Sequence, residues 1–297
     1  MRIAFTSDLH VEYHLEVVGL LAEEAARIAP DALVLAGDVC QDLGRLERSL
    51  RLLTRALACP VIFLPGNHEL WCGGVLAQGP DSRERYERLL PALALRAGAL
   101  PLGQEPVQIG RLAFVGATGW YDGSLRTAQR PLDSPVGSGD STPFESRGAG
   151  AAGRIRSVDH AQVNWPGPGG IPLGDRDLAL LMLESLGDQL ASVRDHSGPV
   201  VVVTHMLPHP GLAADLEGTH YAGTEPFLGS AAMWPVIVSN PRVEAVICGH
   251  LHLVRQAFLP GVAGTIRCEL SPVGYPREIH GSLEDRVAER LRLIEID

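Results

Sequence analysis

The chain contains no lysine, so its 25 basic residues are all arginine, which we attribute to coding bias rather than to chemistry. The 35 acidic residues outnumber them, and the formal net charge is −10. Non-specific binding to duplex nucleic acid depends on basic side chains that neutralise phosphates, so this balance argues against a partner of that kind. It does not exclude small phosphorylated substrates, because bound metal ions carry their own positive charge.

Cysteine is also scarce, and long apolar runs are absent. The five cysteines are scattered and form no CxxC pair, which excludes a disulfide framework and favours a reducing compartment. No run approaches the roughly 18 apolar residues of a membrane span. Residues 1–5 lead directly into candidate ligands and leave no room for a signal peptide. We therefore expect a cytoplasmic protein that does not enter membranes.

What the 297-residue chain does contain is an alternation of short apolar runs and helical patterns. This order is typical of an α/β fold with right-handed crossovers. Two late runs, 265–270 and 290–296, are predicted to be antiparallel strands that close a sheet edge. No linker divides the chain, so we treat 1–297 as one domain. The other predicted strands are 3–6, 32–36, 61–64, 111–117, 199–203 and 243–247, and the predicted helices are 16–29, 43–58, 81–97 (interrupted at Pro91) and 177–193.

One segment departs from this alternation. Residues 123–175 are rich in glycine, proline and serine, and we predict that they form an excursion from the domain that caps the site. Within the excursion, Asp159, His160, Asn164 and Trp165 are the chemically notable side chains, and we expect each to have a structural role.

Acids, amides and histidines follow five of the predicted strands. The carboxyl ends of parallel strands are where α/β proteins bind ligands, so we expect these side chains to converge. They offer oxygen and imidazole donors without thiolate, a set that suits Mn, Fe or Zn. They also exceed the three or four protein ligands of one open catalytic site, which indicates two metal ions. The residues are Asp8, His10, Asp38, Asn67, His68, His205, His250 and His252.

The order of these motifs (D-x-H, G-D, G-N-H-E, T-H, G-H-x-H) resembles the calcineurin-like metallophosphoesterase superfamily. Two further segments, 116–120 and 271–276, resemble those of bacterial predicted phosphohydrolases in this superfamily. The resemblance implies a four-layer α/β/β/α sandwich of two mixed sheets, with a dinuclear metal site at the rim of the strand-end loops. It places Asp8, His10 and His252 on one metal ion, Asn67, His205 and His250 on the other, and Asp38 between them.

The resemblance also implies a catalytic role for His68, which is not a metal ligand in the family pattern. One position departs from the subgroup, because Met206 stands where a second histidine often follows the strand. From their places in loops, His209, His220 and Tyr275 are candidates for substrate contact.

The expected activity is hydrolysis of small phosphodiesters or phosphomonoesters, nucleotides included, by in-line attack of a metal-bridging hydroxide. His68 would act at the leaving-group oxygen. A protein phosphatase or a nuclease of the same superfamily is an alternative. A non-catalytic binding scaffold on this fold is another, although such a scaffold is expected to have lost ligands that this chain retains.

Overall fold

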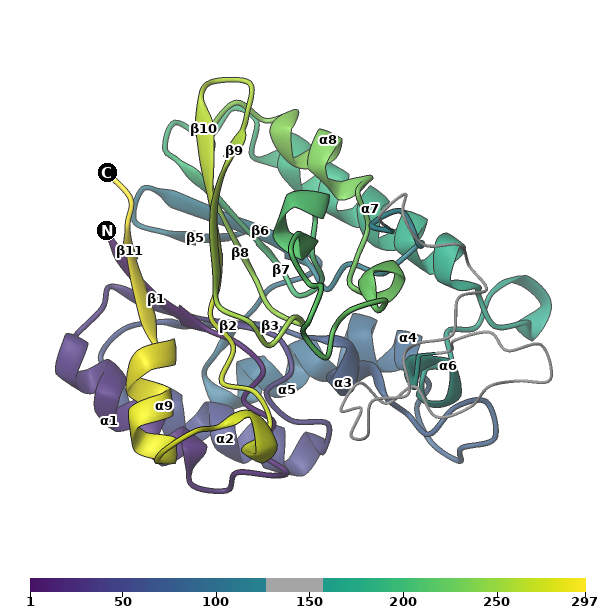
Figure 1. Ribbon diagram of the computed structural model, residues 1–297, viewed down its shortest axis with the longest axis horizontal. Helices are drawn as coiled ribbons and strands as arrows, with labels where there is room; N and C mark the ends of the chain where they lie inside the picture. The colour runs from purple at the N-terminus through teal and green to yellow at the C-terminus, as the bar shows by residue number, and fades with distance from the viewer. Residues whose placement is uncertain (127–156) are drawn as a thin grey trace.

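The computed structural model describes residues 1–126 and 157–297. In these residues two β-sheets lie face to face, and helices cover the outer face of each sheet (Figure 1). The four-layer sandwich and the mixed sheets are therefore confirmed. The middle of the predicted excursion, 127–156, lies outside the described residues.

The first sheet has the strand order β11-β1-β2-β3-β4. Its three pairings from β1 to β4 are parallel, whereas β11 pairs antiparallel with β1 and closes the edge, as predicted. The strands are β1 (Arg2–Thr6), β2 (Ala32–Ala36), β3 (Val61–Leu64), β4 (Leu100–Pro101) and β11 (Arg292–Glu295).

The second sheet has the order β5-β6-β7-β8-β10-β9. The prediction that 265–270 closes a sheet edge is wrong, because β10 lies inside the sheet, parallel to β8 and antiparallel to β9. The edge strand is β9, whose exposed alternate residues gave no apolar run in the sequence. The strands are β5 (Val107–Ile109), β6 (Leu112–Ala117), β7 (Val200–Thr204), β8 (Val243–Cys248), β9 (Arg255–Pro260) and β10 (Thr265–Leu270).

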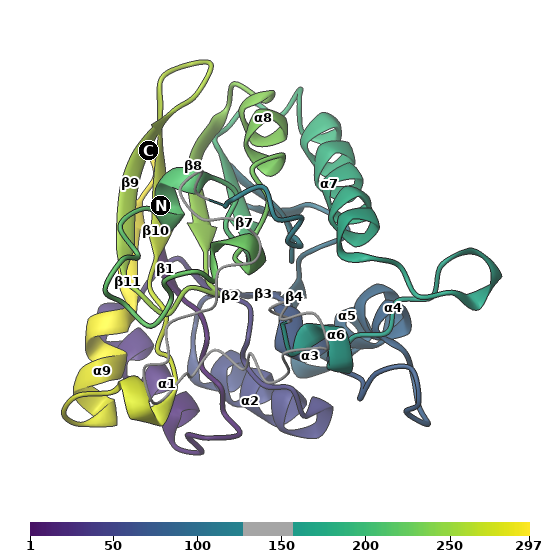
Figure 2. The ribbon, with the colours of Figure 1, turned by 45° about the vertical axis from the view of Figure 1, so that its right-hand side comes forward.

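Helices α1, α2, α5 and α9 pack on the first sheet, and α7 and α8 pack on the second (Figure 2). Pro91 does not break its helix: a π-helical turn, η1 (Arg85–Leu89), precedes it, and the proline occupies the first turn of α5, where its missing N–H costs no bond. The α-helices are α1 (Val17–Ile28), α2 (Leu43–Ala56), α3 (Asn67–Leu70), α4 (Ser82–Glu84), α5 (Leu90–Ala97), α6 (Asp159–Gln162), α7 (Asp175–Ser192), α8 (Met233–Val238) and α9 (Leu283–Arg290). The 3₁₀ turns are η2 (Pro168–Gly170), η3 (Pro210–Ala213), η4 (Glu225–Phe227) and η5 (Pro276–Glu278).

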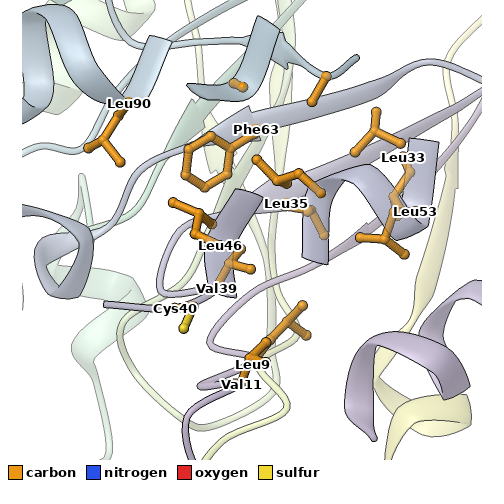
Figure 3. Close-up of a cluster of buried hydrophobic side chains, with 14 of the residues drawn as sticks. Leu9, Val11, Leu33, Leu35, Val39, Cys40, Leu46, Leu53, Phe63 and Leu90 are labelled. Carbon is orange, nitrogen blue, oxygen red and sulfur yellow. The ribbon is translucent and has the colours of Figure 1, made fainter. Parts of the chain in front are cut away.

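Alternate residues of each inner strand point to two different apolar layers. In β2, Val34 contributes to the layer between the sheets, whereas Leu33 and Leu35 pack against the helices together with Leu46 of α2 (Figure 3). A parallel strand buried on both faces reads as a continuous apolar run, which is why the sequence predicted these strands. Within the described part of the chain, every helix is too short or too polar to span a bilayer.

Candidate metal centre

The loops that follow β1, β2, β3, β7 and β8 meet at one rim of the sandwich. Backbone hydrogen bonds join them: the Asp8 amide donates to the Gly37 carbonyl at 2.9 Å, and the Gly249 amide donates to the His205 carbonyl at 2.9 Å. The Gly274 amide donates to the Asp8 carbonyl at 3.0 Å, which ties the segment after β10 to the same place. Strand ends from both sheets are thereby held together.

Four of the predicted ligands have left-handed backbone conformations. The φ angles are 53° at Asp8, 44° at His10, 54° at Asp38 and 67° at His250. Such angles are uncommon for residues other than glycine, and strained backbone is concentrated at functional sites because the surrounding structure must hold it in place. Here the strain turns the side chains toward one another just after their strands end.

The predicted ligand side chains converge in buried clusters. Donor atoms of Asp8, His10 and His252 lie within 4.8 Å of one another, and so do those of Asp38, His205 and His250. A further cluster of this kind joins His10, Asp38 and His68. Short approaches include His205 Nε2 to the Asn67 Oδ1 atom at 3.0 Å, His252 Nε2 to Asp8 Oδ1 at 3.2 Å, and His205 Nε2 to Asp38 Oδ2 at 3.3 Å.

Two of the imidazoles are oriented by partners outside the clusters. The Nδ1 atom of His205 lies 2.8 Å from the Ala36 carbonyl oxygen, so Nε2 faces the other donors. In His252, Nδ1 lies 2.7 Å from Glu278 Oε2, and again Nε2 faces inward. Metal-binding histidines commonly donate their second ring N–H to a carbonyl or carboxylate. These clusters of oxygen and imidazole donors therefore fit divalent transition-metal ions.

The buried charges shift the pKa values in opposite directions. Burial alone would raise the pKa of Asp8, but the neighbouring His252 outweighs it and lowers that pKa to about 2. Burial alone would lower the pKa values of the two histidines, but the carboxylates beside them raise the pKa of His205 to about 9 and that of His252 to about 10. The site thus concentrates negative charge, which bound cations would neutralise in place of these protons.

His68 lies beside the clusters at the start of α3. Its Nε2 atom is 3.8 Å from Asp38 Oδ2 and 3.4 Å from the Tyr275 hydroxyl oxygen. The ring stacks on Trp71, with 3.7 Å between ring centroids. Burial is the main reason that the pKa of His68 is lowered, because a buried imidazolium loses its hydration.

Several contacting residues were not predicted as site residues. Glu12 lies two residues beyond His10, which itself lies two residues beyond Asp8. This spacing could have identified Glu12 from the sequence, because alternate residues of an extended segment share a face. Asp159, expected to be structural, is buried in α6 and accepts a hydrogen bond from Asn67 Nδ2 at 2.9 Å. Nothing in the sequence near Asp159 indicated this contact, because 92 residues separate the two partners.

The metal-ligand clusters open into a pocket. Of the three candidates for substrate contact, Tyr275 lines it, and His220 lies beside it, with Nε2 3.7 Å from Glu278 Oε1. The third, His209, is not brought to the lining: its Nδ1 accepts a hydrogen bond from the Gly211 amide, and its ring packs against Trp234. The lining residues are Asp38, Asn67, His68, Trp71, Ser157, Val158, Asp159, Tyr221, His250, His252, Tyr275 and Glu278.

Comparison with known proteins places this geometry in a family. The model of the calcineurin-like phosphoesterases matches residues 1–254. The [acyl-carrier-protein] phosphodiesterase PptH of Mycobacterium tuberculosis is 28% identical over 273 residues, which cover 87% of this chain and 74% of that protein.

Solved structures share the fold. The phosphopantetheinyl hydrolase PptH of Mycobacterium tuberculosis superposes with a TM-score of 0.66 at 23% identity, covering 93% of this chain and 90% of that one. Protein TT1561 of Thermus thermophilus superposes with a TM-score of 0.53 at 14% identity, covering 100% and 99%. Because the family model spans most of its length, the chain belongs to the calcineurin-like phosphoesterase family and is a metallophosphoesterase that hydrolyses phosphoric esters.

Proposed function

We propose that the chain is a two-metal phosphodiesterase that prefers diesters to monoesters. In this proposal Asp8, His10 and His252 hold one metal ion, Asn67, His205 and His250 hold the other, and Asp38 lies between them. When bound, the two cations of the Mn, Fe or Zn type supply positive charge for the phosphate and acidify water. The carboxylate and imidazole donors of each proposed metal position lie within 4.8 Å of one another, which supports the assignment.

The role proposed for His68 is protonation of the leaving-group oxygen. Its ring faces the pocket beside the ligand clusters, where an imidazolium can donate a proton to the leaving group. Asp38 Oδ2 is 3.8 Å from His68 Nε2, so the carboxylate orients the imidazole toward the place where the phosphate binds. Tyr275 also lines the pocket, and its hydroxyl oxygen lies 3.4 Å from His68 Nε2. The hydroxyl can contact substrate there.

The preference for diesters rests on the charges of the pocket. Among the described residues that line it, three are carboxylates and none is an arginine, in a chain without lysine. A phosphomonoester is a dianion near neutral pH and is commonly held by guanidinium groups. A diester carries one negative charge and two organic groups, so it demands less positive charge from the protein.

The names of the similar proteins suggest one diester in particular, the phosphopantetheinyl group on an acyl carrier protein. The proposal therefore includes protein-attached diesters as substrates, whereas the charges of the pocket support only a general preference for phosphodiesters. The five free cysteines further support a reducing, cytoplasmic setting for the enzyme.

The test compares hydrolysis by the Mn-supplemented protein of bis(p-nitrophenyl) phosphate, p-nitrophenyl phosphate, a cyclic nucleotide and phosphopantetheinylated acyl carrier protein. We expect kcat/KM to be higher for the diesters than for the monoester, and the His68→Ala variant to lose about 10²–10⁴-fold in kcat. A higher kcat/KM for p-nitrophenyl phosphate would overturn the diester preference. Mass spectrometry of the carrier protein shows whether the pantetheinyl diester is cleaved.

A further inference from the structure

Asp159 brings a buried carboxylate to the metal centre from a segment distant in the sequence. It is 3% exposed, and its Oδ1 atom accepts hydrogen bonds from Asn67 Nδ2 at 2.9 Å and from Trp71 Nε1 at 2.7 Å. We propose that Asp159 is a positioning residue that sets the amide of Asn67 and, through Trp71, the imidazole of His68. The inference rests on the proposed roles of Asn67 and His68.

The first effect concerns which end of the Asn67 amide faces the metal centre. An amide oxygen is a metal ligand and an amide NH₂ group is not, so a flipped Asn67 could not bind a cation. Asp159 Oδ1 accepts from the NH₂ end of Asn67, because the amide oxygen has no hydrogen to donate. The oxygen then points the opposite way, where it lies 3.0 Å from His205 Nε2.

The second effect concerns the ring of His68. Trp71 donates its indole N–H to the same oxygen of Asp159, which fixes the plane of the indole. That plane stacks on the His68 ring with an interplanar angle of 25°. One carboxylate oxygen therefore orients two neighbouring functional groups, a ligand and the proposed proton donor. The other oxygen accepts from Ser157 Oγ at 2.8 Å, so both carboxylate oxygens are held.

A purely structural role would be to attach α6 to the rest of the molecule. Other contacts already do this: the Cys72 and Gly74 amides donate to the Gln162 carbonyl at 2.9 Å and 3.0 Å, and the Asn164 amide donates to Ser82 Oγ at 2.9 Å. The attachment is therefore shared among several bonds, whereas the orientation of Asn67 depends on Asp159. Ser82→Ala is the control: it weakens the attachment, and the other hydrogen bond of this hydroxyl, to the Leu70 carbonyl at 2.7 Å, lies at the opposite end of α3 from Asn67.

The experiment uses the full chain and compares Asp159→Leu, Asp159→Asn, Trp71→Phe and Ser82→Ala with the wild type. It measures Mn bound per chain after desalting, the dissociation constants for Mn, the melting temperature and kcat on bis(p-nitrophenyl) phosphate. Asp159→Leu should bind one Mn²⁺ tightly and the other about 10–100-fold more weakly, since orienting partners of ligands have effects of this size. Asp159→Asn should keep both ions, because its amide oxygen can still accept both hydrogen bonds.

Trp71→Phe should still bind both metal ions and keep an aromatic ring against His68, but its kcat should fall. A fall in kcat without loss of metal separates the effect of Asp159 on His68 from its effect on Asn67. Ser82→Ala should lower the melting temperature without changing Mn binding. The proposal is overturned if Asp159→Leu binds two Mn²⁺ ions as tightly as the wild type, or if Ser82→Ala weakens Mn binding equally. Metal binding is measured without turnover, so this test does not depend on activity. A wild type that binds two ions but cleaves no phosphoester would refute the proposed function, and the metal-binding comparison would still test the role of Asp159.

Discussion

At the scale of single residues, two histidines of the centre are oriented by hydrogen bonds to oxygen atoms behind them. Glu278 stands behind His252, and the Ala36 carbonyl stands behind His205. Glu12 is placed similarly, with Oε1 3.7 Å from His10 Nδ1 and 3.9 Å from His68 Nδ1. A carboxylate there stabilises a proton on Nδ1 of His68, and with it the imidazolium form that the proposed proton donation from Nε2 requires.

We predict that Glu12→Gln lowers kcat about 10–100-fold on a diester with a poor leaving group, such as a phenyl ester. The loss should be smaller on a p-nitrophenyl ester, because a good leaving group needs less help from a proton donor. Steady-state kinetics on the two substrates measure the difference.

The matched comparison is Glu12→Gln combined with His68→Ala. If Glu12 acts through His68, the double variant should lose little more than His68→Ala alone, since effects of residues that act as a unit do not add. Fully additive losses would show instead that Glu12 acts through His10 and its metal ion.

At the scale of elements, the strand ends are close-packed, and glycine permits this packing. A Cβ atom on Gly66 would lie 2.6 Å from the Asp38 amide nitrogen and would overlap the Asp38 carboxylate. Glu69 reinforces the same turn, because its carboxylate accepts from the Gly66 amide at 2.6 Å and the Asp38 amide at 3.0 Å. The loops after β2 and β3 are thereby joined directly behind the carboxylate that lies between the metal positions.

Gly66→Ala is therefore expected to displace Asp38 and to lower activity by about 100-fold, the cost of misplacing a reacting group by roughly 1 Å. Gly19→Ala in α1 is the control: a Cβ atom there meets nothing within 4 Å, and alanine in a helix is favoured by about 0.5–1 kcal/mol. It should raise the free energy of unfolding in urea and leave kcat unchanged. A Gly66→Ala variant with wild-type kcat would contradict the proposed packing.

An ion pair links α6 to the start of α7. His160 Nε2 lies 2.7 Å from Asp175 Oδ2, and this hydrogen bond is the main cause that raises the pKa of His160 above its ordinary 6.5. The stabilisation from a raised histidine pKa is fully present below pH 6.5 and is lost as the pH rises through the raised value.

We predict that His160→Gln lowers the free energy of unfolding at pH 5.5 by up to about 1 kcal/mol, the usual size for a partly exposed pair. The difference from the wild type should shrink by pH 9. Urea denaturation at the two pH values measures it. A difference that grows with pH would show that the charged pair is not what stabilises this contact.

Particular elements show which features were predictable from sequence. The runs that became β2, β3 and β7 were predictable because both faces of each strand are buried. Strand β9 has one exposed face and α9 is short and polar, so neither gave an apolar pattern. The ligands of the centre follow strands and could be found, but the contacts of Asp159 depend on a long-range approach that no local pattern indicates.

At the scale of the whole molecule, the centre lies where the two sheets meet. Asp8, Asp38 and Asn67 follow strands of the first sheet, whereas His205 and His250 follow strands of the second. Cations bound by both sets would connect the two halves of the sandwich. The unfolded chain has no such converging donors, so binding should favour the folded state.

This placement predicts that metal ions stabilise the entire fold. Mn²⁺ at about 100 times its dissociation constant should add about 2.7 kcal/mol to the free energy of unfolding of EDTA-treated protein. For a chain of 297 residues that corresponds to a rise in melting temperature of roughly 4 °C. Asp38→Asn removes the charge of the carboxylate that lies between the two proposed metal positions, so its rise should be clearly smaller. Calorimetry of both proteins with and without Mn²⁺ decides the matter, because equal shifts would show that the ions bind elsewhere on the molecule and do not join the sheets.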